Sequence, residues 1–179
     1  DQGLTWPDYQ TVMTSPSGQV LYWESKILEL ADQRLLAVAW AYDEAARCDL
    51  PNQYALSSDG GNTWSSPCST ELTGQTLTPL LLDDGRILNV YRRIDQPGLW
   101  ACVSRLEGEQ WVNESQQPLW GQRGGQGTTN TGENMVENFN TLKFGAPSLT
   151  KLPDGRVFCV FWCYEEMISI IRWYSFSVT

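Results

Sequence analysis

Three pairs of apolar runs, each pair joined by a short polar turn, dominate the pattern of hydrophobic and polar positions. The paired runs lie at 26–30 and 35–40, at 79–82 and 87–91, and at 147–152 and 157–162. The turns between them read Ala-Asp-Gln-Arg, Asp-Asp-Gly-Arg and Pro-Asp-Gly-Arg. Asp-Gly between apolar runs is a strong hairpin signal, because glycine readily adopts the backbone that a tight turn requires. The sequence therefore predicts three antiparallel hairpins, whose nearly continuous apolar second strands are typical of strands buried on both faces.

Further strand-like segments follow each predicted hairpin, so the repeating unit has four strands. Third strands are expected at 53–56, 99–104 and 168–176. Trp64 and Trp111 occupy matching places in the first two repeats and are about 47 residues apart, within the range of roughly 40–50 residues typical of one blade of a β-propeller. The pattern predicts an all-β chain with about three four-stranded antiparallel blades.

Composition narrows the classes of function. The 179 residues carry a formal net charge of −9, which disfavours nucleic acid and anionic membranes as partners, because both attract positive surfaces. No apolar run is long enough for membrane insertion. The chain has no histidine, so acid–base chemistry would fall to Asp, Glu, Tyr or Lys. The five cysteines include no Cys-x-x-Cys pair; we expect buried free thiols, although Cys48 and Cys68 flank one repeat and could pair.

A turn motif follows the third strand of the first repeat: Ser57-Ser58-Asp59-Gly60-Gly61-Asn62-Thr63-Trp64. Asp59 can accept hydrogen bonds from N–H groups that follow it, and Gly60 and Gly61 permit positive φ. The hydroxyls of Ser57 and Thr63 can cross-link the turn, and Trp64 can lock it onto the sheet. Asp1–Trp6 repeats the last six positions as Asp-x-Gly-x-Thr-Trp. This motif resembles the Asp-box of the sialidase-like (BNR-repeat) β-propeller proteins.

The resemblance implies the C-terminal portion of a six-bladed sialidase-like propeller, with the Asp-box on the face away from the ligand. We expect one partial domain over 1–179, with an outer strand and connection at 1–20, blades at 21–67, 76–116 and 147–179, and a long connection at 117–146. Three blades cannot close a ring, since propellers have about four or more. The chain is therefore expected to be truncated, or to be completed by self-association through exposed blade edges. Residues near 1–12 are expected to pair with the last repeat.

The long loops opposite the Asp-box carry the candidate chemistry. The candidate catalytic residues are Asp43, Glu44, Tyr164 and Glu165; the candidate substrate-binding residues are Arg92, Arg93, Asp95, Gln75, Trp120 and Lys143; and the long connection adds Arg123, Glu133, Glu137 and Asn140. The resemblance implies arginines that grip the carboxylate of sialic acid, a Tyr–Glu nucleophile pair, an Asp acid/base, and no metal or other cofactor. Arg92 or Arg93 is similar to one such arginine. Tyr164 and Glu165 are adjacent, which places them on opposite sides of an extended chain and makes them poor candidates for the pair.

These observations lead to two functional hypotheses. The first is a sialidase-like glycoside hydrolase that acts on a terminal sugar, acidic or neutral, and that is incomplete and inactive as this chain. The alternative is a non-catalytic Asp-box propeller that binds carbohydrate or protein. The family's early Arg-Ile-Pro signature does not occur in the sequence, which fits the loss of the first blades and also leaves the alternative open.

Overall fold

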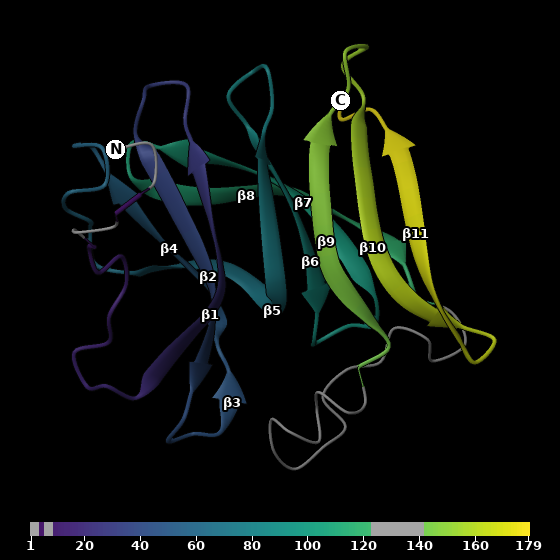
Figure 1. Cartoon of the computed structure of the whole chain (residues 1–179), viewed down its shortest axis with the longest axis horizontal. Helices are drawn as coiled ribbons and strands as arrows, with labels where there is room; N and C mark the ends of the chain where they lie inside the picture. The colour runs from purple at the N-terminus through teal and green to yellow at the C-terminus, as the bar shows by residue number, and fades with distance from the viewer. Residues whose placement is uncertain (1–3, 6–8, 123–141) are drawn as a thin grey trace.

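The computed structural model describes residues 4–5, 9–122 and 142–179, and within these residues the chain is built from antiparallel β-strands (Figure 1). The strands are β1 (Val20–Glu29), β2 (Leu35–Asp43), β3 (Cys48–Asp49), β4 (Pro51–Ser57), β5 (Cys68–Leu81), β6 (Ile87–Arg93), β7 (Leu99–Glu107), β8 (Gln110–Trp120), β9 (Phe144–Lys151), β10 (Val157–Glu165) and β11 (Ile168–Phe176). The described residues include no helix long and apolar enough to cross a lipid bilayer.

The strands form three sheets that follow one another in chain order. The first two sheets share β5, which is long enough to pair with a strand of each. Its first part, 68–73, pairs with β4, and its second part, 74–81, pairs with β6. The first sheet comprises β1, β2, β4 and the start of β5, with the short β3 beside β2. The second sheet comprises the end of β5, β6, β7 and β8, and the third comprises β9, β10 and β11. The three predicted hairpins are confirmed as β1–β2, β5–β6 and β9–β10.

The three hairpin turns share one hydrogen-bond pattern. In each turn the leucine that follows the first strand donates its N–H to the carbonyl of the turn arginine, as Leu82 does to Arg86 (2.8 Å). The aspartate two positions before that arginine accepts its backbone N–H and forms an ion pair with its guanidinium, as Asp84 does with Arg86. The three Asp-x-Arg turns are therefore fixed by local bonds.

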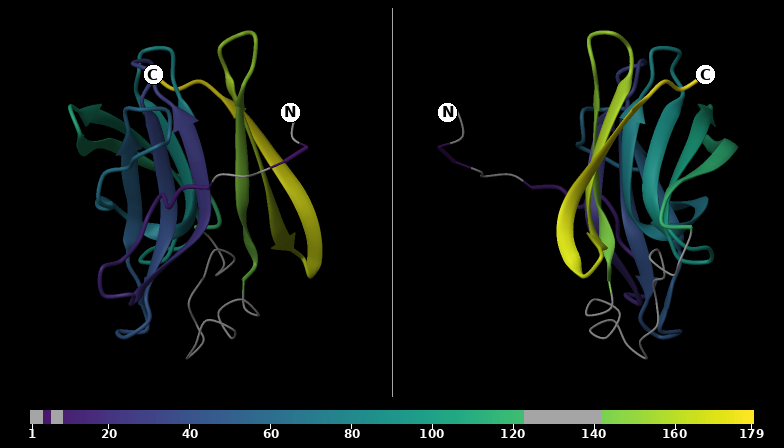
Figure 2. Two further views of the ribbon diagram at one scale, coloured as in Figure 1. Left: turned by 60° about the vertical axis from the view of Figure 1, so that its left-hand side comes forward. Right: turned by 90° about the vertical axis from the view of Figure 1, so that its right-hand side faces the viewer.

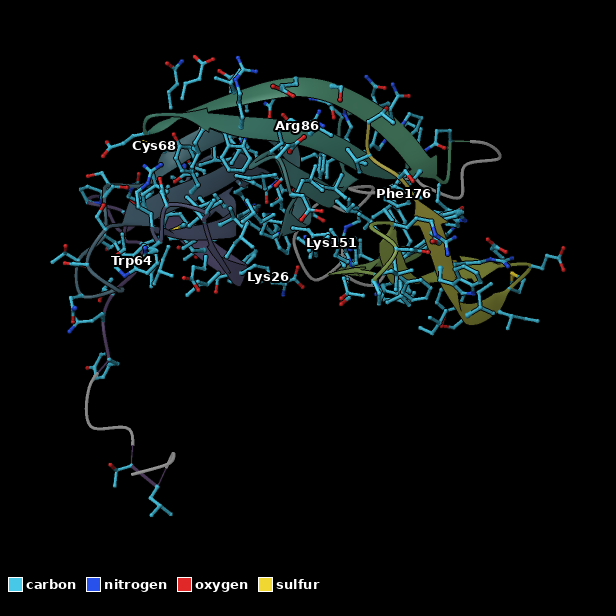
Figure 3. All side chains as sticks on the ribbon, turned by 90° about the horizontal axis from the view of Figure 1, so that it is seen from above. Lys26, Trp64, Cys68, Arg86, Lys151 and Phe176 are labelled. Carbon is cyan, nitrogen blue, oxygen red and sulfur yellow. The ribbon has the colours of Figure 1, made fainter. Side chains whose placement is uncertain are left out.

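Two apolar clusters lie between neighbouring sheets. Successive side chains of a strand point to opposite faces of its sheet, so alternate residues of the second strand belong to different clusters. Leu36 and Val38 of β2 pack with Ile87 of β6 in the cluster between the first and second sheets. The next residue of β6, Leu88, packs with Val157 of β10 in the cluster between the second and third sheets. The sheets thus stack in series, with Trp64 and Phe176 towards opposite ends of the stack (Figure 3).

The inner strands β1, β5 and β9 lie side by side and share an irregularity (Figure 1). Each contains a non-glycine residue with positive φ, at Glu24 (49°), Thr76 (55°) and Ala146 (46°). Each of these lies six positions before the leucine that enters the hairpin turn, and each interrupts the pairing register of its strand. Lys26 of β1 and Lys151 of β9 lie on the side of the molecule away from β7 and β8 (Figure 3).

Three expectations are corrected. Residues 9–19 form no strand, and residues 4–5 and 9–12 do not pair with the third sheet, so β11 keeps an open edge. An edge strand needs a partner within reach, and Thr11, Val12 and Thr14 instead lie beside Tyr22 and Trp64 at the opposite end of the stack (Figure 3). Cys48 and Cys68 are exposed rather than buried, and all five cysteines are unpaired. Much of the half motif Asp1–Trp6 lies outside the described residues.

Candidate functional site

The two ends of the stacked sheets differ in chemistry. We call the end with the three hairpin turns the turn end; it also carries 58–67 and Gly108, whose carbonyl accepts a hydrogen bond from Arg34 (2.9 Å). The other end, here the loop end, carries the connections 44–47, 94–98 and 166–167 together with β3 (Figure 1). The predicted catalytic and substrate-binding residues that the structure describes belong to the strand ends and connections of this loop end, apart from Gln75 in the middle of β5.

Arg92 is the most buried charged side chain at the loop end, with 2% of its surface exposed. It lies directly opposite Gln75 in the β5–β6 ladder, and its Nε donates to Gln75 Oε1 (2.9 Å). Its Nη1 donates to the carbonyl of Phe144 in the third sheet (3.0 Å). A Cβ on Gly145 would lie 2.3 Å from the same Nη1, so only glycine leaves room for the guanidinium there.

The carboxylate of Asp49 binds Gln75 on the side away from Arg92 and so orients the Gln75 amide toward Arg92. Asp49 of β3 accepts hydrogen bonds from Trp40 Nε1 (2.5 Å) and from Gln75 Nε2 (2.7 Å). Because the amide nitrogen of Gln75 is engaged by Asp49, its oxygen faces Arg92. The chain of contacts Trp40–Asp49–Gln75–Arg92, here called the Arg92 network, links the first and second sheets, and the bond from Arg92 to the Phe144 carbonyl connects it to the third.

Burial and nearby charge act on Arg92 in opposite directions. Removal from water lowers the pKa of Arg92 to about 10, while the negative charges of Glu24 and Asp49 oppose that decrease. The guanidinium therefore stays cationic at neutral pH. None of the ion pairs formed among the described residues involves Arg92. A buried cation held by an amide and a carbonyl can bind an oxygen-rich anionic group strongly.

Sequence reasoning missed four residues here: Glu24, Trp40, Asp49 and Gly145. Glu24 is exposed and is strained, because left-handed backbone is costly for a non-glycine residue. Strain of this kind is characteristic of functional sites. Glu24, Thr76 and Ala146 lie at the same distance from their turns, which is visible in the sequence. Only the backbone angles show that these three positions share a left-handed conformation.

Arg93 faces the other way and is already paired. Its Nε and Nη2 bind both carboxylate oxygens of Asp95 (2.6 and 2.8 Å), and its guanidinium lies 4.5 Å from the ring centroid of Trp100. Hydrogen bonding to Arg93 lowers the pKa of Asp95. The structure therefore brings the predicted residues Arg93 and Asp95 together as a surface ion pair, away from Arg92 on the opposite face of β6.

Trp120 and Glu165 also contact each other, but this contact serves packing and not a binding site. Trp120 Nε1 donates to Glu165 Oε1 (2.9 Å), and the ring is buried against Phe144 and Phe161. Arg172 forms an ion pair with Glu165 and lowers the pKa of that carboxyl. Because the residue is only 7% exposed, Trp120 offers no open ring face for stacking on a sugar.

The remaining predicted residues are dispersed. Tyr164 packs against Trp162 on the side of β10 opposite Glu165, so the two do not form a Tyr–Glu pair. Asp43 Oδ1 caps its own turn by accepting the N–H of Ala46 (2.9 Å). Glu44 and Lys143 are exposed, and their backbone groups, not their side chains, make the contacts found for them. Arg123, Glu133, Glu137 and Asn140 lie outside the described residues.

The predicted Asp-box residues form a bonded turn at the turn end. Asp59 accepts hydrogen bonds from the backbone N–H (2.9 Å) and the hydroxyl (2.6 Å) of Thr63, and from the hydroxyl of Ser57 (2.8 Å). The N–H of Gly61 donates to Ser57 Oγ (2.9 Å), and the indole of Trp64 donates to the carbonyl of Gly61 (3.0 Å). The bonds from Thr63 lower the pKa of Asp59 to about 2. This turn lies at the opposite end from Arg92.

No His, Cys, Asp and Glu cluster suited to a metal ion occurs within residues 4–5, 9–122 and 142–179. No protein-family model matches the chain, and no curated protein matches it.

Solved structures do match the fold. A protein of unknown function from Dyadobacter fermentans superposes over 100% of this chain and 44% of its own, with a TM-score of 0.71 and 18% identity. A β-1,3-galactosidase of glycoside hydrolase family 43 matches over 89% of this chain and 32% of its own, with a TM-score of 0.59 and 10% identity. An α-L-arabinofuranosidase of family 93 from Fusarium graminearum, solved with arabinobiose, matches over 90% and 46%, with a TM-score of 0.54 and 21% identity.

The chain spans less than half the length of each of these three proteins. At these identities the likeness concerns the fold alone. Families 43 and 93 have propeller folds, so the three stacked antiparallel sheets are similar to part of a propeller glycosidase.

Proposed function

We propose that the chain is part of a sialidase-like, exo-acting glycoside hydrolase and that its loop end binds the acidic group of a terminal sugar through Arg92. The observation that carries the proposal is the buried position of Arg92, which is cationic and held by Gln75 and the Phe144 carbonyl. Desolvation makes such a cation costly unless an anion compensates it. A sugar carboxylate that reaches Arg92 at the loop end would provide that compensation.

Two carboxylates beside Arg92 are the acid–base candidates of this proposal. Glu24 and Asp49 lie near enough to Arg92 to influence its pKa. Glu24 is exposed on the innermost strand of the first sheet, whereas Asp49 is tied to Trp40 and Gln75. Glu24 is therefore the group free to approach a bound sugar, and Asp49 positions the arginine. This assignment replaces Asp43 and Glu165, whose carboxylates are used in a turn and in an ion pair.

The matched solved structures support a sugar as the ligand, and experiment must identify the sugar. Two of them are glycoside hydrolases of families 43 and 93, and one was solved with arabinobiose. Both of these are named for neutral sugars, whereas the buried arginine favours an acidic one. The turn at Ser57–Trp64 is consistent with the sialidase-like reading through its residue pattern and its bonds.

Binding without hydrolysis is the second candidate, and one observation favours it for this chain. Tyr164 and Glu165 lie on opposite sides of β10, so these two residues do not form the nucleophile pair of a sialidase. We expect the chain alone to bind sugar without releasing the fluorophore from a fluorogenic sialoside. Robust release would contradict the interpretation that the site is incomplete.

Calorimetric titration of the whole chain with N-acetylneuraminic acid, galactose and arabinobiose tests the proposal. We expect the acidic sugar to bind most tightly. Replacing Arg92 with Gln should weaken its binding by roughly tenfold to a hundredfold, because charge-assisted hydrogen bonds contribute about 1.5–3 kcal/mol. Arg92→Lys should give an intermediate loss, since it keeps the charge but not the planar fork.

Arg93→Gln is the matched comparison, because the adjacent arginine is occupied by Asp95. It should change the affinity less than about twofold, as expected for the loss of a surface ion pair. Circular dichroism of each variant checks that the sheets are retained. Equal effects of the two substitutions, or equal affinity for acidic and neutral sugars, would remove Arg92 from its proposed role.

A further inference from the structure

One position of the repeat carries Arg92 in the second sheet and an aromatic pair in the first. At this position a residue of the inner strand lies opposite a residue of the second strand and directly precedes the left-handed residue of the inner strand. The three opposed pairs are Trp23–Trp40, Gln75–Arg92 and Gly145–Trp162. Trp23 in the first sheet therefore occupies the place that Gln75, the partner of Arg92, occupies in the second.

Trp23 and Tyr42 form a partly accessible aromatic pair, here called the aromatic platform. Their rings stack with centroids 5.7 Å apart and 20° between the planes. Trp40 supports the platform from inside, because it is 1% exposed and its ring meets Trp23 edge-on with centroids 4.8 Å apart. Trp23 and Tyr42 are half-buried, so each keeps part of its surface open. The platform can therefore contact an apolar part of a ligand while Trp40 holds it in place.

The aromatic platform and Arg92 belong to one cluster at the loop end. Asp49 lies opposite Tyr42 in the β2–β3 ladder. Its carboxylate accepts hydrogen bonds from Trp40 (2.5 Å) and from Gln75 (2.7 Å). Gln75 in turn accepts the Nε–H of Arg92 (2.9 Å). One carboxylate thus binds both the residue that supports the platform and the residue that holds the cation.

Arg92 leaves only part of its guanidinium to a ligand. Its Nε and Nη1 are engaged by Gln75 and by the Phe144 carbonyl, whereas Nη2 makes no hydrogen bond to the residues that the structure describes. Among these residues the fully buried side-chain atoms without a partner include Thr76 Oγ1 but not Arg92 Nη2, so Nη2 reaches the surface of the site. Because Gln75 holds Nε, the fork of Nε and Nη2 is not open to a carboxylate. A single nitrogen offers charge but little contact area, so the rest of a ligand needs another surface.

A sugar acid has the two chemistries that this cluster offers. The C–H groups on one face of its ring are apolar and suit an aromatic surface, and its carboxylate suits a guanidinium. Ligand pockets generally combine aromatic walls with a few polar groups that fix orientation. We propose that Trp23 and Tyr42 bind the ring of the sugar whose carboxylate bonds to Arg92, and that this contact selects cyclic sugar acids over small carboxylates. The selection rests on the proposed role of Arg92 and adds the part of the site that recognises the ring.

NMR titrations of the whole chain with N-acetylneuraminic acid and with acetate, a carboxylate without a ring, test this selection. Both ligands should shift the Nε–H signal of Arg92. Trp23→Leu removes the indole but keeps an apolar side chain. It should weaken the binding of N-acetylneuraminic acid roughly tenfold, as expected for the loss of about 60 Å² of apolar contact, and change the acetate affinity less than about twofold. Tyr42→Leu should act in the same direction, whereas Tyr42→Phe, which keeps the ring, should retain the wild-type affinities.

Trp173→Leu is the matched control. Trp173 is 61% exposed on β11, the edge strand drawn in yellow in Figure 2, and it belongs to the third sheet rather than the first. The same substitution there should leave both affinities unchanged. Circular dichroism checks that each variant keeps its sheets, and Tyr42→Leu tests the platform independently if Trp23→Leu unfolds the chain.

Two results would overturn the proposal. In the first, N-acetylneuraminic acid shifts the Arg92 signal, but the substitutions of Trp23 and Tyr42 by Leu weaken its binding no more than they weaken that of acetate. The platform then does not bind the ring, while the role of Arg92 stands. In the second, neither ligand shifts the Arg92 signal, so the proposed function fails and the selection fails with it.

Discussion

Arg92 and Arg93 are neighbours in the sequence, yet alternation along β6 gives them different environments. Arg93 reaches Asp95 and Trp100 near the surface, where an ion pair contributes little. Arg92 points into the layer between the sheets, where Gln75 and the Phe144 carbonyl hold it. A one-residue shift of β6 would exchange these roles, so the register of the β5–β6 ladder sets the chemistry of the loop end.

At the turn end, the pKa of Asp59 depends on the hydrogen bonds that its carboxylate accepts. Its pKa of about 2 is below the ordinary value of 3.8, so its hydrogen bonds stabilise the fold fully above about pH 4 and that stabilisation is lost as the pH falls towards 2. We expect Asp59→Asn to show a smaller decrease in unfolding free energy than the wild type between pH 5 and about 2, measured by urea denaturation.

The control for this measurement is Asn62→Ala, which removes the bond from the Asn62 amide to the Asp59 carbonyl (2.6 Å). That substitution changes no charge, so it should lower stability by a similar amount at both pH values. An Asp59→Asn variant with the full pH dependence of the wild type would contradict the role given to its hydrogen bonds.

At the scale of elements, the three hairpin turns are equivalent in bonding but differ in one residue. Gly85 and Gly155 adopt φ of 83° and 82°, and Gln33 occupies the same place with φ of 69°. A Cβ at Gly85 or Gly155 would meet no atom within 4 Å. The difference between the turns is therefore one of backbone strain and not of packing.

Gln33→Gly should raise the free energy of unfolding by roughly 0.5–1 kcal/mol, because glycine relieves the left-handed strain but loses more entropy on folding. The reverse change, Gly85→Gln, should lower it by about the same amount. Urea denaturation midpoints of the two variants check this pair. Two changes of the same sign would indicate that contacts, rather than backbone angles, distinguish these turns.

The hairpins could be predicted from the sequence because their turns are stabilised by residues two positions apart, such as Asp84 and Arg86. The Arg92 network could not, since its members are brought together by strand pairing and by bulges on the inner strands. Residues 9–19 form no strand, although one was expected near the N-terminus, because strand formation depends on a partner edge, which a repeat pattern does not provide. The dispersal of Asp43, Glu165 and Arg92 likewise depends on which face of a strand each occupies.

At the scale of the whole molecule, the two ends of the stack differ in their side-chain contacts. The turn end is closed by local hydrogen bonds at 31–34, 57–64, 83–86 and 153–156. The loop end carries a buried cation, Arg92, which bonds to Gln75 in the second sheet and to the Phe144 carbonyl in the third. The proposed ligand site and the locally bonded turns thus lie at opposite ends of one stack, an arrangement that is usual where a rigid scaffold carries functional loops.

The central claim is that the ligand site lies at the loop end around Arg92. An NMR titration of the chain with N-acetylneuraminic acid tests it most directly, by following the Nε–H signal of Arg92 and the indole N–H signal of Trp64 at the turn end. The account predicts a saturable shift of the Arg92 signal while the Trp64 signal stays in place. A stationary Arg92 signal, or a larger shift at Trp64, would contradict it.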